Sequence, residues 1–135
     1  LAIARDIVKH LSHTKVRCAK RIAVENPVSI ISTRIRKPDQ IIQPYQFGHE
    51  VSKSTCLWLK NVPKLVPTKI VSKGEFFEWK CKTTGRIKRQ SMWHKQARDL
   101  KPKDRQTFRS RTFKGISEAM ADQWGKAIDT ARAVV

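Results

Sequence analysis

Acidic residues are scarce in this 135-residue chain: 11 Asp and Glu stand against 29 Lys and Arg, which leaves a net charge of +18. Such an imbalance costs self-repulsion and is best explained by a polyanionic partner. The basic residues are also clustered, because residues 60–114 carry 17 basic and 4 acidic residues. We therefore expect this middle segment to contact nucleic acid or another polyanion, with a solvated basic loop as the alternative.

Cysteine pairs, long apolar runs and a leader pattern are lacking as well. The three Cys residues are odd in number and show no C-x-x-C spacing, which argues against a disulfide framework and for a reducing compartment. No Cys or His pair has the spacing typical of a zinc site, so we expect no metal. No apolar run approaches about 18 residues, and the start LAIARDIVKHL has no signal-peptide pattern, so we predict a cytoplasmic protein without membrane contact. Because the chain begins at Leu1 inside a helical pattern, we expect that sequence upstream is missing.

What is present favours a folded α/β protein, with 39% hydrophobic and 30% charged residues. Apolar residues recur at helical spacing over residues 1–12, which predicts an amphipathic helix. The next segment, RIAVE, is short, apolar and β-branched, and predicts a strand buried on both faces, as in a parallel sheet. Glu25 and Asn26 end this strand, and Pro27 then blocks regular hydrogen bonding. The carboxyl end of such a strand is the ligand side of an α/β sheet.

Later segments differ in how clearly they predict structure. The segment VSIISTRIRKPDQ is expected to be irregular or partly helical, and IIQPYQFG and STCLWLK to be extended. FFEWKCK predicts a strand and TTGRIKRQ a turn and return, whereas MWHKQARDLKPKDRQ has too few apolar residues for a core helix. An apolar stripe from Phe113 to Val135 predicts a helix that begins near Thr112, with Thr112 or Ser110 as N-cap. Gly115 and Gly125 in that helix indicate close packing or a break near Gly125.

Two stretches carry a family resemblance. RIAVENPVSIISTRIRKPDQIIQPYQFGHEVSKSTCLWLKNVPKLVPT and RSRTFKGISEAMADQWG, about half of the chain, resemble the C-terminal part of phage and prophage DNA cytosine C5-methyltransferase-like proteins. The resemblance implies the C-terminal portion of a Rossmann-like methyltransferase fold with a basic, partly irregular insertion. It divides the chain into a partial Rossmann-like core (1–67), a basic nucleic-acid-binding insertion (68–109) and a C-terminal core helix (110–135).

The same resemblance implies a catalytic site. In these enzymes a Glu-Asn-Val tripeptide at a strand end brings its glutamate to a flipped cytosine, which gives Glu25 that role with Asn26 beside it. Pro27 stands where the larger enzymes have valine. From position alone, a structural role in which Glu25 pairs with an arginine is the alternative.

Two parts of the family's machinery are absent from these residues. The five glycines form no Gly-rich loop for S-adenosylmethionine, and no cysteine follows a proline, so the Pro-Cys nucleophile is missing. We therefore expect either the C-terminal portion of a longer DNA-modification protein, with S-adenosylmethionine bound by the missing half, or a non-catalytic basic RNA- or DNA-binding component of a large nucleoprotein assembly.

The candidate nucleic-acid contacts are basic residues that lie in or near this pattern, with DNA favoured over RNA as partner. They are Arg34, Arg36, Lys37, Lys53, Lys80, Lys82, Arg86, Lys88, Arg89, Lys95, Arg98, Arg109 and Arg111. Aromatic residues alternate with them over residues 76–93, where aromatic faces can stack on bases. The alternative for these aromatic residues is a small core of their own, with only the cations facing solvent.

Overall fold

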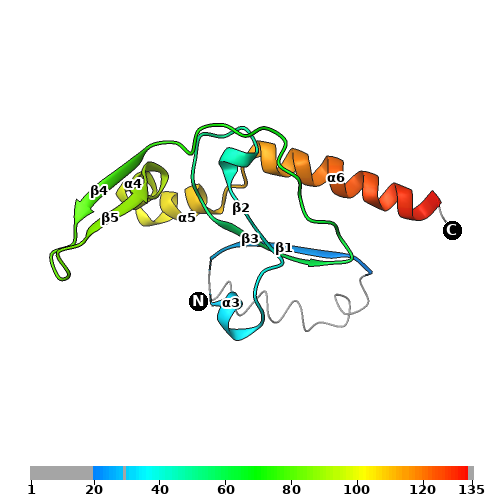
Figure 1. The fold of residues 1–135 in the computed structure, drawn as a ribbon, viewed down its shortest axis with the longest axis horizontal. Coiled ribbons are helices and arrows are strands. Elements are labelled where there is room, and N and C mark those ends of the chain that lie inside the picture. The colour runs from blue at the N-terminus through cyan, green and yellow to red at the C-terminus, as the bar shows by residue number, and fades with distance from the viewer. Residues whose placement is uncertain (1–19, 29, 134–135) are drawn as a thin grey trace. The chain divides into compact units, whose positions relative to one another are not determined.

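The computed structural model describes residues 20–28 and 30–133, which form a mixed α/β protein with two small antiparallel sheets and several helices (Figure 1). The chain divides by its internal contacts into two units. Unit 1 comprises the chain up to Ile42, Ser54–Leu65 and the chain from Gln123 on, and unit 2 comprises Gln43–Lys53 and Val66–Asp122. The helix predicted for residues 1–12 lies outside the described residues.

Unit 1 contains a three-stranded sheet in the order β1-β3-β2, formed by β1 (Ile22–Pro27), β2 (Gln40–Ile42) and β3 (Thr55–Lys60). Both neighbours pair antiparallel with the central strand β3. The strand predicted at RIAVE therefore exists, but the prediction that it is buried on both faces in a parallel sheet is wrong. As an outer strand, β1 is half-buried on one face and exposed on the other through Glu25, and a Rossmann-like arrangement is not confirmed.

The core of unit 1 forms on both faces of β3. On one face Cys56 and Trp58 pack with Ile31 of the short helix α3 (Ile31–Arg34), which confirms the partly helical prediction for this segment. On the other face Leu57 is fully buried. This alternation is expected of a strand, since successive side chains point to opposite faces.

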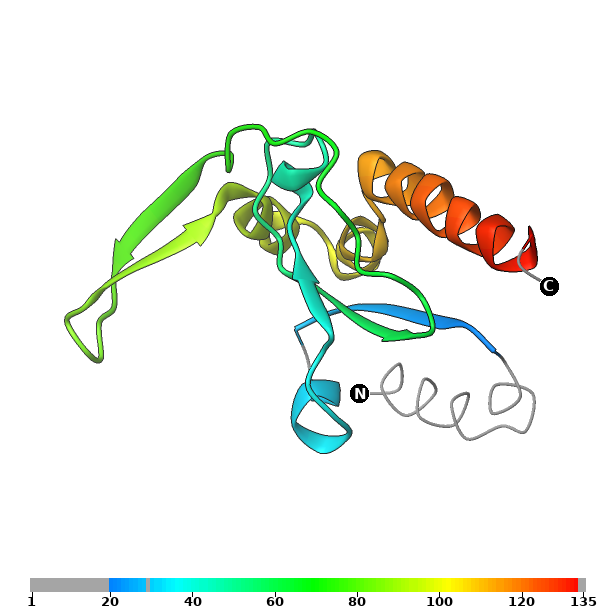
Figure 2. The same ribbon diagram turned by 45° about the vertical axis from the view of Figure 1, so that its right-hand side comes forward.

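Unit 2 contains a hairpin of β4 (Phe76–Lys80) and β5 (Ile87–Ser91), which Figure 2 shows as two adjacent antiparallel arrows joined by a loop. In the connection, Cys81 N–H donates to the Arg86 carbonyl (2.9 Å) and Gly85 N–H donates to the Cys81 carbonyl (2.8 Å). Gly85 has φ +67°, a conformation that glycine adopts without the steric cost of a Cβ. The predicted strand, turn and return are thus confirmed. A single 3₁₀ turn, η1 (Pro44–Gln46), belongs to the same unit.

Two helices follow the hairpin, α4 (Met92–Asp99) and α5 (Pro102–Ser110). The expectation that this segment holds too few apolar residues for a core helix is wrong for α4. Trp93 and Ala97, four residues apart on one face, are both buried, and the Trp93 ring stacks on Phe108 of α5 at 5.2 Å. One large aromatic side chain here buries as much apolar surface as several aliphatic side chains usually do.

The C-terminal helix is α6 (Lys114–Ala133), which confirms the prediction of a long helix. It begins two residues after Thr112, and Ser110 still belongs to α5, so neither predicted N-cap residue holds that position. Ile116 is buried as the apolar stripe predicts. The helix runs through Gly125 without a break.

Candidate nucleic-acid interface

Glu25 and Asn26 lie at the end of β1 and point to opposite faces of the sheet. Asn26 is half-buried and shares its face with Val24, whereas Glu25 is exposed and pairs across the strands with Leu57. Unit 1 has an apolar pocket on the Val24 side of β1. Its lining residues are Ile22, Val24, Ile31, Ile35, Arg36, Trp58, Leu59 and Lys60. Glu25 is not among them, so its carboxylate is at the surface rather than inside this pocket.

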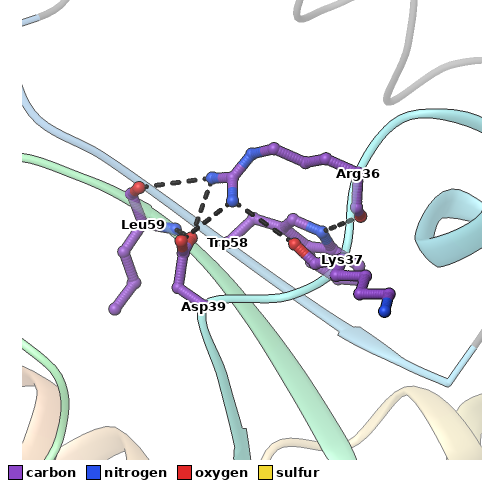
Figure 3. Close-up of polar contacts among 5 residues, drawn as sticks. All are labelled: Arg36, Lys37, Asp39, Trp58 and Leu59. Carbon is purple, nitrogen blue, oxygen red and sulfur yellow. Dashed lines mark hydrogen bonds and ion pairs between the residues drawn. The ribbon is translucent and has the colours of Figure 1, made fainter.

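Arg36 is held by an ion pair with Asp39 (Figure 3). Its two terminal nitrogens donate to the two Asp39 carboxylate oxygens at 2.9 and 2.8 Å, and one of them also reaches the Leu59 carbonyl at 3.3 Å. The backbone N–H of Leu59 donates to Asp39 Oδ2 at 2.6 Å, and the Trp58 indole N–H donates to the Arg36 carbonyl at 2.9 Å. The hydrogen bonds from Arg36, then that from Leu59, lower the pKa of Asp39 from 3.8 to about 2.

This ion pair fastens the chain before β2 to the strand β3. The guanidinium of Arg36 already makes a bidentate contact with a carboxylate. That contact uses the two nitrogens with which it could otherwise hold a phosphate. Of the three predicted contact residues in this segment, Arg34 and Lys37 are exposed cations, whereas Arg36 has an internal structural role.

Lys53 is buried in unit 2 and is therefore poorly placed for the predicted contact with a phosphate. Only 6% of its surface is exposed. Its ammonium donates to the Arg109 carbonyl at 3.0 Å and lies 4.9 Å from the centre of the Trp93 ring and 5.7 Å from that of Phe113. Because this carbonyl belongs to the last turn of α5, the positive charge lies where the helix end is most negative. Lys53 therefore stabilises the fold of unit 2, and we leave it out of the interface.

The hairpin brings five of the predicted contact residues together. They are the exposed cations Lys80, Lys82, Arg86, Lys88 and Arg89, carried on two paired strands and their loop. Glu78, opposite Arg89, is the acidic residue within the two strands, and its carboxylate lies 3.9 Å from the Arg89 guanidinium. Arg89 also lies over the Phe76 ring, at 4.2 Å from its centre. The hairpin thus remains strongly cationic.

Helix α4 adds two predicted cations to the hairpin. Lys95 and Arg98 lie 5.9 and 5.5 Å from the centre of the Phe77 ring. Arg109 and Arg111, at the end of α5, are exposed. Lys101 and Lys103 at the start of α5 are exposed cations that the sequence analysis did not single out. The run KPK was the signal for them.

The aromatic residues of this region divide between the two alternatives. Trp93 keeps 8% of its surface exposed and belongs to the core, whereas Trp79 keeps 37% exposed and stacks on Phe77, with 5.0 Å between the ring centres and 20° between the planes. The alternative of a small aromatic core therefore holds for Trp93. Trp79 is an exposed aromatic ring among cations.

The two described cysteines differ in the pKa of their thiols. Burial raises the pKa of the Cys56 thiol. Hydrogen bonds from Thr84, first from its side chain and then from its backbone, lower the pKa of the Cys81 thiol from 9.0 to about 7. Over residues 20–28 and 30–133, no group of three or more His, Cys, Asp or Glu residues is arranged to hold a metal ion.

Among the helices that the structure describes, none combines the length and the apolar character needed to cross a membrane. Comparison with protein-family models, with curated proteins and with solved structures finds no match to this chain.

Proposed function

We propose that this chain binds nucleic acid through the basic hairpin surface, which we define by the five hairpin cations and the two cations of α4. These residues are Lys80, Lys82, Arg86, Lys88, Arg89, Lys95 and Arg98. The observation that carries the proposal is the grouping of five exposed cations with one exposed tryptophan on a single hairpin. DNA is the favoured partner and RNA the alternative.

The chemistry of the basic hairpin surface matches a sugar–phosphate backbone. Five like charges on two short strands and their loop repel one another, and within this hairpin only Glu78 offsets them. An anionic polymer removes that repulsion, and each contact between a cation and a phosphate releases counterions from the nucleic acid. Binding is thus expected to weaken steeply as salt rises.

The first prediction concerns the salt dependence of binding. Replacing Lys82, Arg86 and Lys88 together by Gln should lower the slope of log Kobs against log [salt] by up to about 3 on duplex DNA, because each lost phosphate contact removes about 0.9. The measurement is fluorescence anisotropy with a labelled duplex over a salt series.

A charge-matched control replaces Lys20, Arg21 and Lys64 by Gln, since these are exposed cations of unit 1. This control should leave the slope within experimental error of the unaltered protein. Equal losses in both triple variants would show that binding follows net charge alone, and the basic hairpin surface would then not be the interface.

A second candidate function is DNA cytosine modification, as the family resemblance implies. It is supported by Glu25, an exposed carboxylate at the end of β1. In that case the three strands of unit 1 belong to a larger Rossmann-like sheet whose upstream half supplies the S-adenosylmethionine site and the Pro-Cys nucleophile. The protein would then act on DNA in the cytoplasm of a phage-infected or prophage-carrying bacterium.

The second prediction tests that candidate in the natural protein, isolated at its full length. Glu25→Gln should abolish methyl transfer to cytosine, because the amide has no acidic proton to give the ring N3 when the nucleophile attacks the ring. Affinity for DNA should stay within about twofold, since Glu25 lies outside the basic hairpin surface. Glu118→Gln, at an exposed position of α6, is the control. Unchanged incorporation of labelled methyl groups in the Glu25→Gln protein would exclude the proposed role.

A further inference from the structure

The two faces of the hairpin differ in chemistry. Directly opposed residues of an antiparallel pair share a face, so Phe77 lies with Gln90 and Trp79 with Lys88. The hydrogen bond from Cys81 N–H to the Arg86 carbonyl continues the ladder and adds that pair to the same row. We call this face the aromatic face. It consists of Phe77, Trp79, Cys81, Arg86, Lys88 and Gln90, and none of these six residues is acidic.

The rings of the aromatic face form an ordered row along β4. Phe77 has the Lys95 ammonium and the Arg98 guanidinium of α4 at 5.9 and 5.5 Å from its ring centre, and on the strand it stacks on Trp79 at 5.0 Å. Contacts with two cations and one ring hold Phe77 in place. Phe77 in turn supports Trp79, which is the next residue of the row and the most exposed tryptophan among the residues that the structure describes.

Charge complementarity selects the occupant of this face. The cross-strand neighbour of Trp79 is Lys88, and Arg86, immediately before β5, is the next residue on this face, so cations lie beside the indole. A nucleobase has a flat face to stack on an aromatic ring, and its own backbone carries the phosphate that Lys or Arg can contact. An apolar protein partner would leave those cations without counter-charge.

We infer that the aromatic face stacks the base of an unpaired nucleotide on Trp79, while Lys88 and Arg86 contact its phosphates. The substrate class is accordingly single-stranded nucleic acid, or a strand with unpaired bases, in preference to a closed duplex. In a duplex both faces of each base are covered by its neighbours, so Trp79 has no base face to stack on. This inference rests on the proposed function and names the form of nucleic acid that the basic hairpin surface takes.

The third prediction tests the stacking directly on the 135-residue chain. Trp79→Leu keeps apolar bulk but removes the aromatic ring, and it should weaken binding to short oligo(dT) by about 5- to 100-fold. Binding to a duplex of equal length should change less than about twofold, since phosphate contacts dominate there. Trp79→Phe should keep most of the oligo(dT) affinity, because it retains a ring. Oligo(U) in a parallel titration tells whether the unpaired strand is DNA or RNA.

The controls separate this inference from the proposed function. If the Lys82, Arg86 and Lys88 variant weakens binding to both probes but Trp79→Leu weakens both equally or neither, the stacking is wrong and the basic hairpin surface stands. If the triple variant changes binding to neither probe, the proposed function fails as well.

Circular dichroism melts show whether the Trp79→Leu protein keeps its fold. If the Trp79→Leu protein unfolds, Trp79→Phe and Trp79→His test the stacking instead. The inference requires the Phe variant to retain more oligo(dT) affinity than the Leu variant and the His variant to lie between these two. Self-association that Trp79→Leu abolishes without loss of oligo(dT) binding would instead assign the face to a second copy of the chain.

Discussion

At the scale of single residues, Asp39 accepts more hydrogen bonds than its exposed position suggests. Its carboxylate accepts two hydrogen bonds from Arg36 and one from the backbone of Leu59, although a third of its side chain is exposed. The backbone bond matters most for the fold, because without Asp39 the N–H of Leu59 on β3 loses this acceptor. The pair Arg36–Asp39 therefore sets the path of the chain into β2.

The fourth prediction follows from this carboxylate. Asp39→Asn should lower the free energy of unfolding at neutral pH by about 1 kcal/mol, a value already reduced for solvent screening. Because the pKa of Asp39 is about 2 in the folded protein against an ordinary 3.8, this stabilisation is present above 3.8 and is lost as pH falls toward 2. Urea denaturation at several pH values should show the difference between the two proteins shrinking through that window.

The control for this prediction is Glu118→Gln on α6. Glu118 pairs with Lys114 at 3.6 Å, and both side chains are largely exposed, so the change should cost less than about 0.5 kcal/mol. A loss for Asp39→Asn no larger than that of the control would show that its hydrogen bonds add nothing to stability.

At the scale of elements, α6 contains two glycines in different surroundings. Gly115 lies so close to the segment after η1 that an added Cβ would overlap the carbonyl oxygen of Phe47. Its N–H also donates to His49 Nε2 at 2.9 Å. A Cβ on Gly125 would meet no atom within 4 Å. The close packing expected from the sequence thus occurs at Gly115 and not at Gly125.

The fifth prediction compares alanine at these two positions of one helix. Gly125→Ala should raise the free energy of unfolding by up to about 1 kcal/mol, because alanine is the better helix former. Gly115→Ala should lower it by about 1–3 kcal/mol, because the backbone of Phe47 cannot accommodate the new methyl group without a shift. Chemical denaturation of both variants measures the difference. Equal stabilisation by both changes would contradict the packing at Gly115.

At the scale of the whole molecule, net charge alone does not locate the interface. Unit 1 carries 13 basic and 4 acidic residues and unit 2 carries 16 and 7, so each unit has a net charge of +9. The net charge of the whole chain is therefore divided equally between the two units, although unit 2 holds 15 of the 17 basic residues of the 60–114 segment. What singles out the hairpin is the local grouping of cations with Trp79, and this is why the charge-matched variant of unit 1 is the decisive control.

The sequence by itself determined the features that depend on neighbouring residues. The segment FFEWKCK predicts a strand, TTGRIKRQ predicts a turn and return, and a three-to-four-residue repeat predicts α6. Each of these patterns is complete within a short stretch of chain, so no distant contact was needed to recognise it.

Only the tertiary structure decided which residues are covered and by what. It pairs RIAVE antiparallel with β3. It buries Lys53 between the Trp93 ring of α4 and the end of α5, and it leaves Trp79 exposed while Trp93 is in the core. The partners of these residues are 30 or more positions away in the sequence in the first two cases, and two tryptophans of equal hydrophobicity cannot be told apart by local pattern. Burial is a property of contacts between distant segments, and the choice of interface residues depends on it.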